Sequence, residues 1–338
     1  MSFLLVLLAA VIVFIAAGFV FQFFGARADR LKFPPPGRLI DVGGHKLHWL
    51  ESGQGLPVVF ESGISASCLN WTDVRARVSG FARACAYDRA GLGWSDPGPK
   101  PRVASRLIGE LHTVIQAAGI RAPFILVGHS FGGLLVQAYA IRYPAAVAAL
   151  VLIDPLPRAE WLRPSASQEK MLARGVRLSR RGAALARIGL VRLALTMLSG
   201  GARRAPQWIA KTASGRAESV ITRLVGEVRK MPRETWPMIQ AHWSLPKTFQ
   251  AMADSLEGLP AGSSEIAGLG PLPTIPVWIL SGSRSTPAQL ADRNRIVEGL
   301  STGRHVIAEK SGHWVHLDQP EHVLDAIRDA VRAASQTR

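Results

Sequence analysis

The first hydrophobic feature of the chain is a long apolar segment at its start. Residues Phe3 to Phe24 are apolar, with Gly18 and Gln22 as the two exceptions. A helix of these 22 residues would be about 33 Å long, which matches the hydrocarbon core of a bilayer. The pattern predicts a membrane-spanning helix, and we assign residues 1–26 to an N-terminal transmembrane anchor.

A cleaved secretory signal peptide is the alternative for this segment. Ala26-Arg27-Ala28 offers a small-residue cleavage pattern. However, no lysine or arginine precedes the apolar run, and the run is longer than the usual signal core of about 7–15 residues. We therefore favour an uncleaved anchor.

Basic residues on one side of the anchor predict its orientation. Arg27, Arg30 and Lys32 follow the apolar run, whereas only the terminal amine precedes it. The positive-inside rule then predicts that the main domain lies on the cytoplasmic side of the membrane. Residues 27–37 form the predicted linker, because the proline run from Phe33 to Gly37 makes a stiff, non-helical spacer.

After the linker, short apolar runs alternate with helical patterns. Gly43-Gly44 separates the first two runs and is typical of the turn in an antiparallel hairpin. The alternation predicts an α/β fold with a mainly parallel sheet and helices on both faces, closed by an amphipathic helix over Glu321–Ala334. The predicted strands are Arg38–Val42, His45–Glu51, Val58–Glu61, Arg83–Tyr87, Phe124–Val127, Leu150–Ile153, Val277–Leu280 and His305–Ala308.

One long interval interrupts this alternation. Between Pro157 and Pro271 the pattern is helical, and more than a hundred residues are too many for a loop between two strands. We predict a helical cap over residues 156–271, inserted between core segments 38–155 and 272–338, with the glycine- and proline-rich stretch from Gly258 to Pro273 as the return loop. The predicted cap helices are Glu169–Arg181, Ala183–Leu198, Glu218–Lys230 and Glu234–Ser255.

The net charge of +16 is concentrated in the cap. Between Leu156 and Gln250 there are 18 Lys or Arg residues and 5 Asp or Glu residues. No recognised nucleic-acid-binding module surrounds them, so next to the anchor the predicted partner is an anionic membrane surface and not a nucleic acid. The two cysteines, Cys68 and Cys85, have no metal-like spacing and indicate neither a zinc site nor a disulfide framework.

Candidate chemistry begins at the turn Gly128-His129-Ser130-Phe131-Gly132. The turn follows the apolar strand Phe124–Val127 and precedes a helical segment, Leu134–Tyr143, that ends before Pro144. A serine at such a corner takes a strained backbone conformation that exposes its hydroxyl, and the glycines let strand and helix approach closely. The context predicts that Ser130 is a nucleophile.

Four motifs together resemble the α/β-hydrolase superfamily, over the chain from about Gly37 to its end. Within it, the chain resembles capped, serine esterase-like hydrolases with an N-terminal membrane anchor, of a bacterial type. The motifs are the turn around Ser130, Val58-Val59-Phe60-Glu61-Ser62-Gly63-Ile64, the segment from Tyr87 to Pro97, and Ser311-Gly312-His313-Trp314.

The resemblance implies a base and an oxyanion hole for Ser130. His313 is the candidate base because it follows a glycine after the last strand; His316 is its nearby competitor. The backbone N–H groups of Phe131 and Ile64 are the candidate oxyanion donors. In many relatives a histidine precedes the glycine of the second donor loop, whereas this chain has Ser62.

The acid of the triad is where the sequence departs from the family pattern. It usually follows the strand Val277–Leu280, but the segment from Ser281 to Thr286 contains no carboxylate. Asp154, directly after Leu150–Ile153, is the candidate acid, with Asp292 as the alternative.

The resemblance implies a serine hydrolase that cleaves an ester, or an amide or thioester, through an acyl-enzyme. It implies no metal and no organic cofactor. The basic cap beside the anchor favours an apolar or lipid-like acyl substrate. It disfavours substrates with a free peptide N-terminus, whose ammonium group it would repel. Ser130 excludes the carboxylate-nucleophile chemistry of the dehalogenases and epoxide hydrolases of this fold. An acyltransferase, or a catalytically idle binding or sensing protein, is the alternative.

Four cap tryptophans suit an acyl pocket, a membrane edge or core packing: Trp161, Trp208, Trp236 and Trp243.

Overall fold

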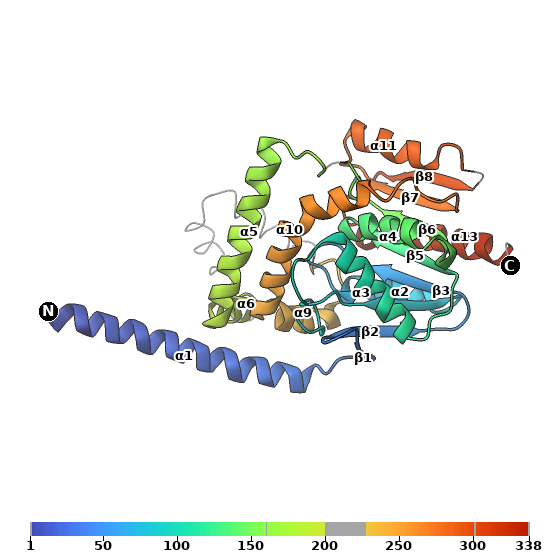
Figure 1. The fold of residues 1–338 in the computed structure, drawn as a ribbon. Helices are drawn as coiled ribbons and strands as arrows, with labels where there is room; N and C mark the ends of the chain where they lie inside the picture. Colours follow the sequence, from blue (N-terminus) through green and yellow to red (C-terminus); the bar gives the residue numbers. More distant parts are fainter. Residues whose placement is uncertain (1, 160, 200–227, 301, 337–338) are drawn as a thin grey trace.

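An eight-stranded sheet forms the centre of the computed structural model, which describes residues 2–159, 161–199, 228–300 and 302–336 (Figure 1). The strand order is β1-β2-β4-β3-β5-β6-β7-β8. The pairings of β2 with β1 and with β4 are antiparallel, and the other five are parallel. This confirms the predicted fold class. The strands are β1 (Arg38–Asp41), β2 (Lys46–Ser52), β3 (Pro57–Glu61), β4 (Arg83–Tyr87), β5 (Phe124–His129), β6 (Val147–Ile153), β7 (Val277–Gly282) and β8 (Gly303–Ala308).

Helices cover both faces of the sheet. Successive side chains of a strand point to opposite faces, and both sets are apolar here, so each face needs a layer of helices to bury it. On β5, Leu126 packs in the core beneath α3 (Ala104–Ala117) and α4 (Phe131–Arg142). Its neighbours Ile125 and Val127 pack in the second core, on the side of α2 and α13. The remaining core elements are α2 (Thr72–Val78), α11 (Pro287–Val297), α12 (Val315–Asp318), α13 (Pro320–Gln336), η1 (Cys68–Trp71) and η2 (Pro144–Ala146).

The inserted region is helical, as predicted, but several boundaries differ. The first break falls at Ile188–Gly189, where Gly189 has φ 70°, and not after Arg181. The predicted helix Glu234–Ser255 is divided before Pro246, which begins the next helix. Most of the predicted helix Glu218–Lys230, and Trp208 with it, lie outside the described residues. The described cap elements are α5 (Ala166–Arg187), α6 (Leu190–Ser199), η3 (Arg233–Thr235), α9 (Trp236–Trp243) and α10 (Pro246–Ala267).

The predicted return loop from Gly258 to Pro273 is wrong over most of its length, because α10 continues to Ala267 and contains Pro260. Packing explains this. A Cβ on Gly258 would lie 2.3 Å from the carbonyl oxygen of Arg102, so the two backbones touch where α10 crosses the start of α3. The close packing outweighs the cost of proline and glycine in a helix interior.

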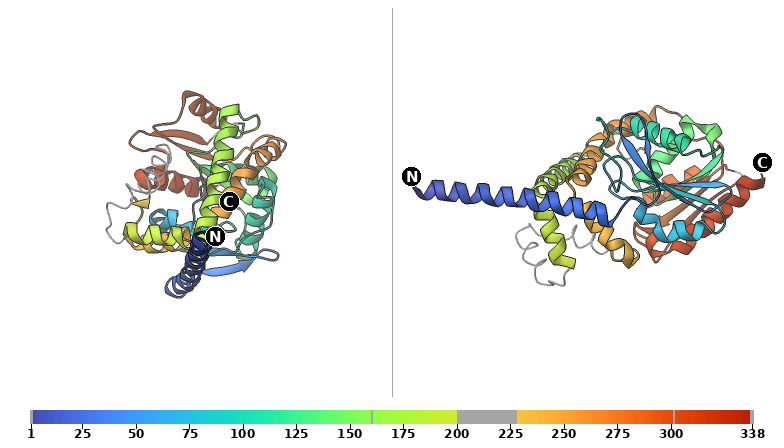
Figure 2. Two further views of the ribbon diagram at one scale, coloured as in Figure 1. Left: turned by 90° about the vertical axis from the view of Figure 1, so that its left-hand side faces the viewer. Right: turned by 90° about the horizontal axis from the view of Figure 1, so that it is seen from below.

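The N-terminal helix α1 runs from Ser2 to Lys32, so the helix continues into the predicted linker and the extended spacer begins at Phe33. Among the described residues, α1 is the one helix whose length and composition suit a membrane span, with a mean hydropathy of 3.1 in its most apolar window. Such a helix is either a membrane anchor or a signal sequence. Its N-terminal half extends away from the body of the molecule (Figures 1 and 2).

Two glycine substitutions test the packing of α10 on α3. Gly258→Ala should lower the free energy of unfolding by about 1–3 kcal/mol, because the new methyl group meets backbone atoms. Gly109→Ala in α3 should raise it by about 0.5–1 kcal/mol, because a Cβ there meets nothing within 4 Å and alanine favours the helix. Chemical unfolding of the full chain in detergent measures both, and the same sign for the two variants would contradict the packing argument.

Candidate active site

Ser130 lies at the sharp turn between β5 and α4. Its φ of 55° and ψ of −118° are rare for a residue with a side chain. The turn is held by the Ser130 N–H, which donates to the Ile153 carbonyl at 2.9 Å, and by the Ser130 carbonyl, which accepts from Leu156 at 3.0 Å. A Cβ on Gly128 would come within 2.7 Å of Gly133 in α4. The predicted strained elbow is therefore present.

Asp154 is the second residue with a strained backbone conformation. With φ 41°, it is the one described non-glycine residue besides Ser130 that has a positive φ. It directly follows β6, and its N–H donates to the Leu280 carbonyl at 2.6 Å. Strained residues that the surrounding structure holds in place tend to gather at functional sites. Here the two strained residues end neighbouring parallel strands.

His313 meets Asp154. His313 lies on the loop between β8 and α12, and its Nδ1 is 2.5 Å from Oδ2 of Asp154. The two predicted residues are thus brought together although 159 positions separate them. Within the described residues, no hydrogen bond joins the Ser130 hydroxyl to the His313 ring; such bonds often form only when substrate is bound.

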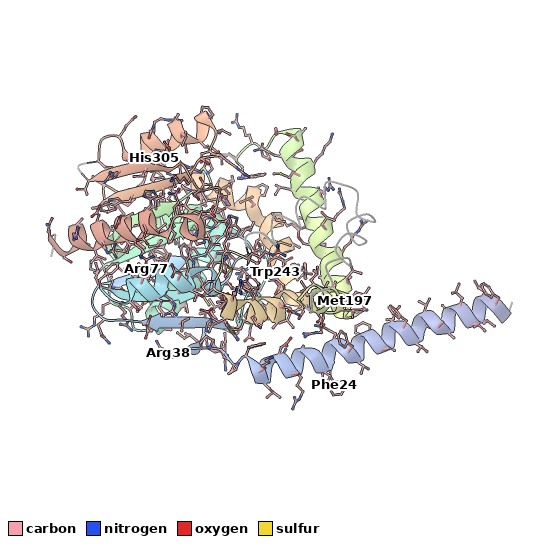
Figure 3. The ribbon with its side chains drawn as sticks, turned by 180° about the vertical axis from the view of Figure 1, so that it is seen from behind. Phe24, Arg38, Arg77, Met197, Trp243 and His305 are labelled. Atoms are coloured by element: carbon pink, nitrogen blue, oxygen red, sulfur yellow. The ribbon has the colours of Figure 1, made fainter. Side chains whose placement is uncertain are left out.

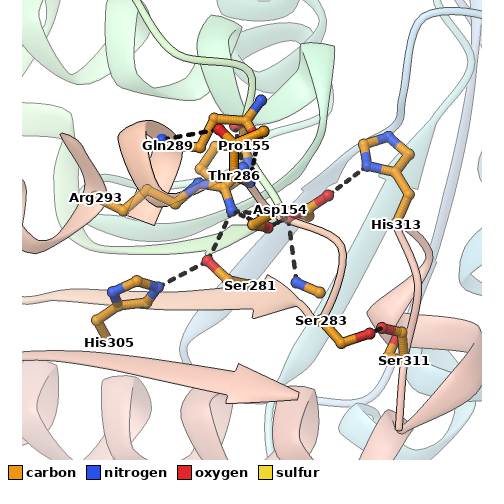
Figure 4. A network of polar contacts seen from close by, with 12 residues as sticks. Asp154, Pro155, Ser281, Ser283, Thr286, Gln289, Arg293, His305, Ser311 and His313 are labelled. Carbon is orange, nitrogen blue, oxygen red and sulfur yellow. Dashed lines mark hydrogen bonds and ion pairs between the residues drawn. The ribbon is translucent and has the colours of Figure 1, made fainter. Parts of the chain in front are cut away.

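A buried arginine holds the other oxygen of the Asp154 carboxylate (Figure 4). Arg293, on α11, is 3% exposed, and its Nη1 donates to Asp154 Oδ1 at 2.8 Å. The same guanidinium donates to the Pro155 carbonyl at 2.9 Å and to the hydroxyls of Ser281 and Ser285 at 2.7 and 2.8 Å. The hydroxyl of Ser285 in turn donates to Asp154 Oδ1 at 2.9 Å.

These contacts keep Asp154 ionised. Burial alone would raise the pKa of Asp154, but the hydrogen bond from His313 and the charge of Arg293 outweigh it and hold that pKa below its usual value. The segment from Ser281 to Thr286, where a carboxylate was missing, supplies the Ser285 hydroxyl and the Gly282 N–H to Asp154. Sequence reasoning missed Arg293; the serines after β7 were the one signal of a polar partner.

His316 and Asp292, the alternatives to His313 and Asp154, lie in different surroundings. His316 is fully buried against Trp71, and neither of its ring nitrogens has a hydrogen-bond partner in the described structure. Burial lowers the pKa of His316 to about 3. Asp292 lies on the outer side of α11, where it pairs with Arg295 at 3.6 Å. Neither residue meets the partner that a triad role requires.

Arg89 contacts both segments that carry the predicted oxyanion donors. The Arg89 guanidinium donates to the carbonyls of Ser62, at 2.6 Å, and Gly63, and its centre lies 5.5 Å from the Phe131 ring. In a trans peptide the C=O and N–H point in opposite directions. Because the Gly63 carbonyl faces Arg89, the Ile64 N–H of the same peptide points away from it, and that N–H makes no hydrogen bond within the described residues.

A pocket between core and cap is lined by Trp314, the residue that follows His313, but not by His313 or Ser130 themselves. It lies against Trp314, whose ring centroid is 6.1 Å from that of His313. Burial lowers the pKa of His242, on the cap side of the pocket, to about 4, so this ring is neutral. Of the cap tryptophans, Trp243 lines the pocket and Trp161 is in the main core. The lining includes Ser65, Leu92, Met231, His242, Trp243 and Trp314.

One further cluster has the residue types of a metal site. His48, Cys68 and Asp88 place their ligand atoms within 4.8 Å of one another. However, both ring nitrogens of His48 face acceptors, Asp88 Oδ2 at 2.8 Å and the Pro36 carbonyl. Burial raises the pKa of the Cys68 thiol well above its usual value, so it is a poor ligand. His48 and Asp88 form a buried pair, and the contact of His48 with the Pro36 carbonyl connects the spacer after α1 to the core.

Comparison with known proteins identifies the family of the chain. A model described as the alpha/beta hydrolase family matches residues 58–326. Protein YqjL of Bacillus subtilis is 30% identical over 105 residues, covering 31% of this chain and 42% of YqjL. The cis-3-alkyl-4-alkyloxetan-2-one decarboxylase of Shewanella oneidensis is 27% identical over 146 residues, covering 39% of this chain and 46% of the decarboxylase.

Solved structures support the fold. A thermophilic esterase from Thermogutta terrifontis superimposes with a TM-score of 0.56 at 20% identity, covering 88% of this chain and 97% of the esterase. The matches to the two curated relatives span less than half the length of each. These findings support a hydrolase-type enzyme, without specifying its substrate.

Two asparagine substitutions test the buried carboxylate. Asp154→Asn should lower the free energy of unfolding by about 2 kcal/mol, because Arg293 and His313 lose a charged acceptor. Asp292→Asn, on α11 next to Arg293 but paired with the exposed Arg295, should change it by less than about 0.5 kcal/mol. Chemical unfolding of the full chain measures both, and equal effects of the two substitutions would contradict the assigned geometry.

Proposed function

The chain belongs to the alpha/beta hydrolase family, and we propose that it is a serine hydrolase that cleaves an ester through an acyl-enzyme on Ser130. One observation carries the proposal. The strained Ser130 turn lies next to a strained, ionised Asp154 that meets His313 at 2.5 Å. Nucleophile, acid and base then follow one another along the chain as Ser130, Asp154 and His313, the order typical of this fold.

Each group has a role in the proposed reaction. The hydroxyl oxygen of Ser130 attacks the acyl carbonyl, and its proton passes to Nε2 of His313. The ester C–O bond then breaks, and the alcohol leaves with that proton. Water next attacks the acyl-enzyme, with His313 again accepting a proton, and releases the carboxylic acid and free Ser130.

The protein stabilises the charges that form during these steps. The N–H groups of Ile64 and Phe131 would stabilise the oxyanion, and neither donates a hydrogen bond within the described structure. Asp154 holds the Nδ1–H of His313, which sets the ring tautomer and stabilises the imidazolium. Arg293 and Arg89 would act as positioning residues, one behind Asp154 and one behind the oxyanion loop.

The pocket and the anchor support an apolar acyl substrate. Leu92, Met231, Ile239 and Trp243 contribute apolar side chains to the pocket that Trp314 lines next to His313 in the chain. We further infer that α1 is a retained membrane anchor with the enzyme on the cytoplasmic side. Cleavage after Ala28 would remove Gln22, whose side chain donates to the Ser244 carbonyl at 3.0 Å in the folded domain.

A fluorophosphonate probe tests the nucleophile. We expect labelling of the full chain and its loss in Ser130→Ala, together with a fall in ester turnover of about 10⁴-fold or more. Ser335→Ala, which replaces an exposed serine of the last helix, is the control and should leave labelling unchanged. Folded wild-type protein that does not react would favour the binding or sensing alternative, and acyl transfer in preference to hydrolysis would favour an acyltransferase.

The pH dependence of ester hydrolysis tests Arg293. In Arg293→Met the Asp154 charge is no longer compensated, which favours the protonated ring of His313. The acid limb of the kcat/KM profile should therefore move up by about one pH unit. Arg293→Lys keeps the charge and should leave the limb near its wild-type position. If Arg293→Met lowers stability while the limb stays in place, Arg293 is structural only.

A further inference from the structure

Exposed apolar side chains outside α1 gather on the cap. Met171, Leu178 and Leu185 on α5 are spaced by seven residues, and Leu193 and Met197 on α6 by four. Each spacing puts its members on one side of a helix. All five are between 44% and 57% exposed. Each of the two cap helices therefore carries an exposed apolar stripe, and we call the two stripes together the cap face.

Basic residues accompany the stripe on α5. Among its 22 residues are six basic ones and one acidic one. Arg177 and Arg181 are exposed next to Leu178, as is Arg187 next to the end of the stripe. A helix with an apolar stripe among arginines is typical of helices that lie in the headgroup region of an anionic membrane.

A polar contact fixes the cap to α1. Gln22, the one polar side chain in the apolar run, is buried; it donates to the Ser244 carbonyl and accepts from Nε of Arg192 at 3.0 Å. Arg192 also pairs with Asp29 at 2.6 Å. A Cβ on Gly18 would lie 2.3 Å from the Ile188 carbonyl oxygen, so α1 touches the α5–α6 corner at backbone distance.

These contacts set the depth of the cap relative to a bilayer. A helix that spans the hydrocarbon core needs about 20 residues, which from Phe3 extends to about Gln22. The cap already touches α1 at Gly18. If α1 crosses the membrane, the α5–α6 corner therefore reaches the interface between hydrocarbon and headgroups.

The orientation of the cap helices agrees with this depth. In Figure 1 α5 runs across the direction of α1, at the side of the body from which α1 emerges. Viewed along α1, α5 and α6 lie at the front of the molecule (Figure 2, left). Figure 3 shows Met197 at the end of the cap beside α1.

We propose that the cap face lies in the headgroup region of an anionic membrane, so that α1 and the cap together hold the enzyme on the bilayer. The proposal rests on the function proposed above in one respect, namely that α1 is a retained anchor. It adds that an ester dissolved in the bilayer is the accessible substrate class, because the cap that forms one wall of the pocket is held at the lipid surface.

A site-specific fluorescent label tests the cap face. Both native cysteines are buried, and burial raises the pKa of Cys85 to about 12, so an introduced surface cysteine reacts selectively. The full chain carrying Leu178→Cys or Met197→Cys is labelled with an environment-sensitive dye and reconstituted in phosphatidylcholine–phosphatidylglycerol vesicles. Ile307→Cys, an equally exposed apolar position on β8, is the matched control, and Phe14→Cys on α1 reports insertion of the anchor.

We expect blue-shifted emission at positions 178 and 197, with quenching by spin-labelled lipid at least about twofold stronger than at position 307. Replacing phosphatidylglycerol with phosphatidylcholine should weaken that quenching. If positions 178 and 197 behave like 307 while position 14 is quenched, the proposal is wrong. A blue shift without lipid quenching would indicate a protein partner, such as a second copy, and would also overturn it. Fluorophosphonate labelling of the same samples reports Ser130 separately, so the two proposals can fail independently.

Discussion

The Asp154 carboxylate lies between two cationic or potentially cationic groups, and the candidate site is arranged around it. One oxygen accepts from Arg293 and the other faces Nδ1 of His313. A buried carboxylate requires such partners, because an unpaired charge in the interior is very costly. This need for partners links β6, α11 and the loop after β8. The elements that form the candidate site are therefore the same elements that stabilise the buried charge of Asp154.

The parallel sheet is what makes this arrangement possible. The carboxyl ends of β3, β5, β6 and β7 meet at one edge, which is where ligands bind in open α/β sheets. Ser130 and Asp154 both leave that edge with a positive φ, and the backbone hydrogen bonds from Ser130 to Ile153 and from Asp154 to Leu280 hold the two turns. Local strain is thus supported by neighbouring strands.

A second set of polar contacts links the core, the cap and α1. Gln22 and Asp29 on α1 meet Arg192 on the cap, and Trp94 of the core donates to the Phe33 carbonyl at 2.9 Å. The C-terminal half of α1 is therefore part of the folded domain. An enzyme built this way presents one side of its cap towards whatever surrounds its N-terminal helix.

Local patterns predicted the elements that local forces control. The strands, the Ser130 turn and the helical cap could be read from apolar periodicity and from glycine and proline positions, because these act over a few residues. The continuation of α10 through Pro260 could not, because it depends on backbone contact with Arg102 in another element. The helical state of residues 27–32 was missed for a similar reason, since Asp29 is held by Arg192 on the cap.

The sequence by itself determined the class of fold, the apolar helix and the candidates Ser130, His313 and Asp154. Only the tertiary structure decided which carboxylate meets His313, and that Arg293 and Ser285 hold it. It also decided that Gln22 joins α1 to the cap. The physical reason is that a buried polar group is stable only with partners, and those partners lie more than a hundred residues away along the chain, where no local pattern can identify them.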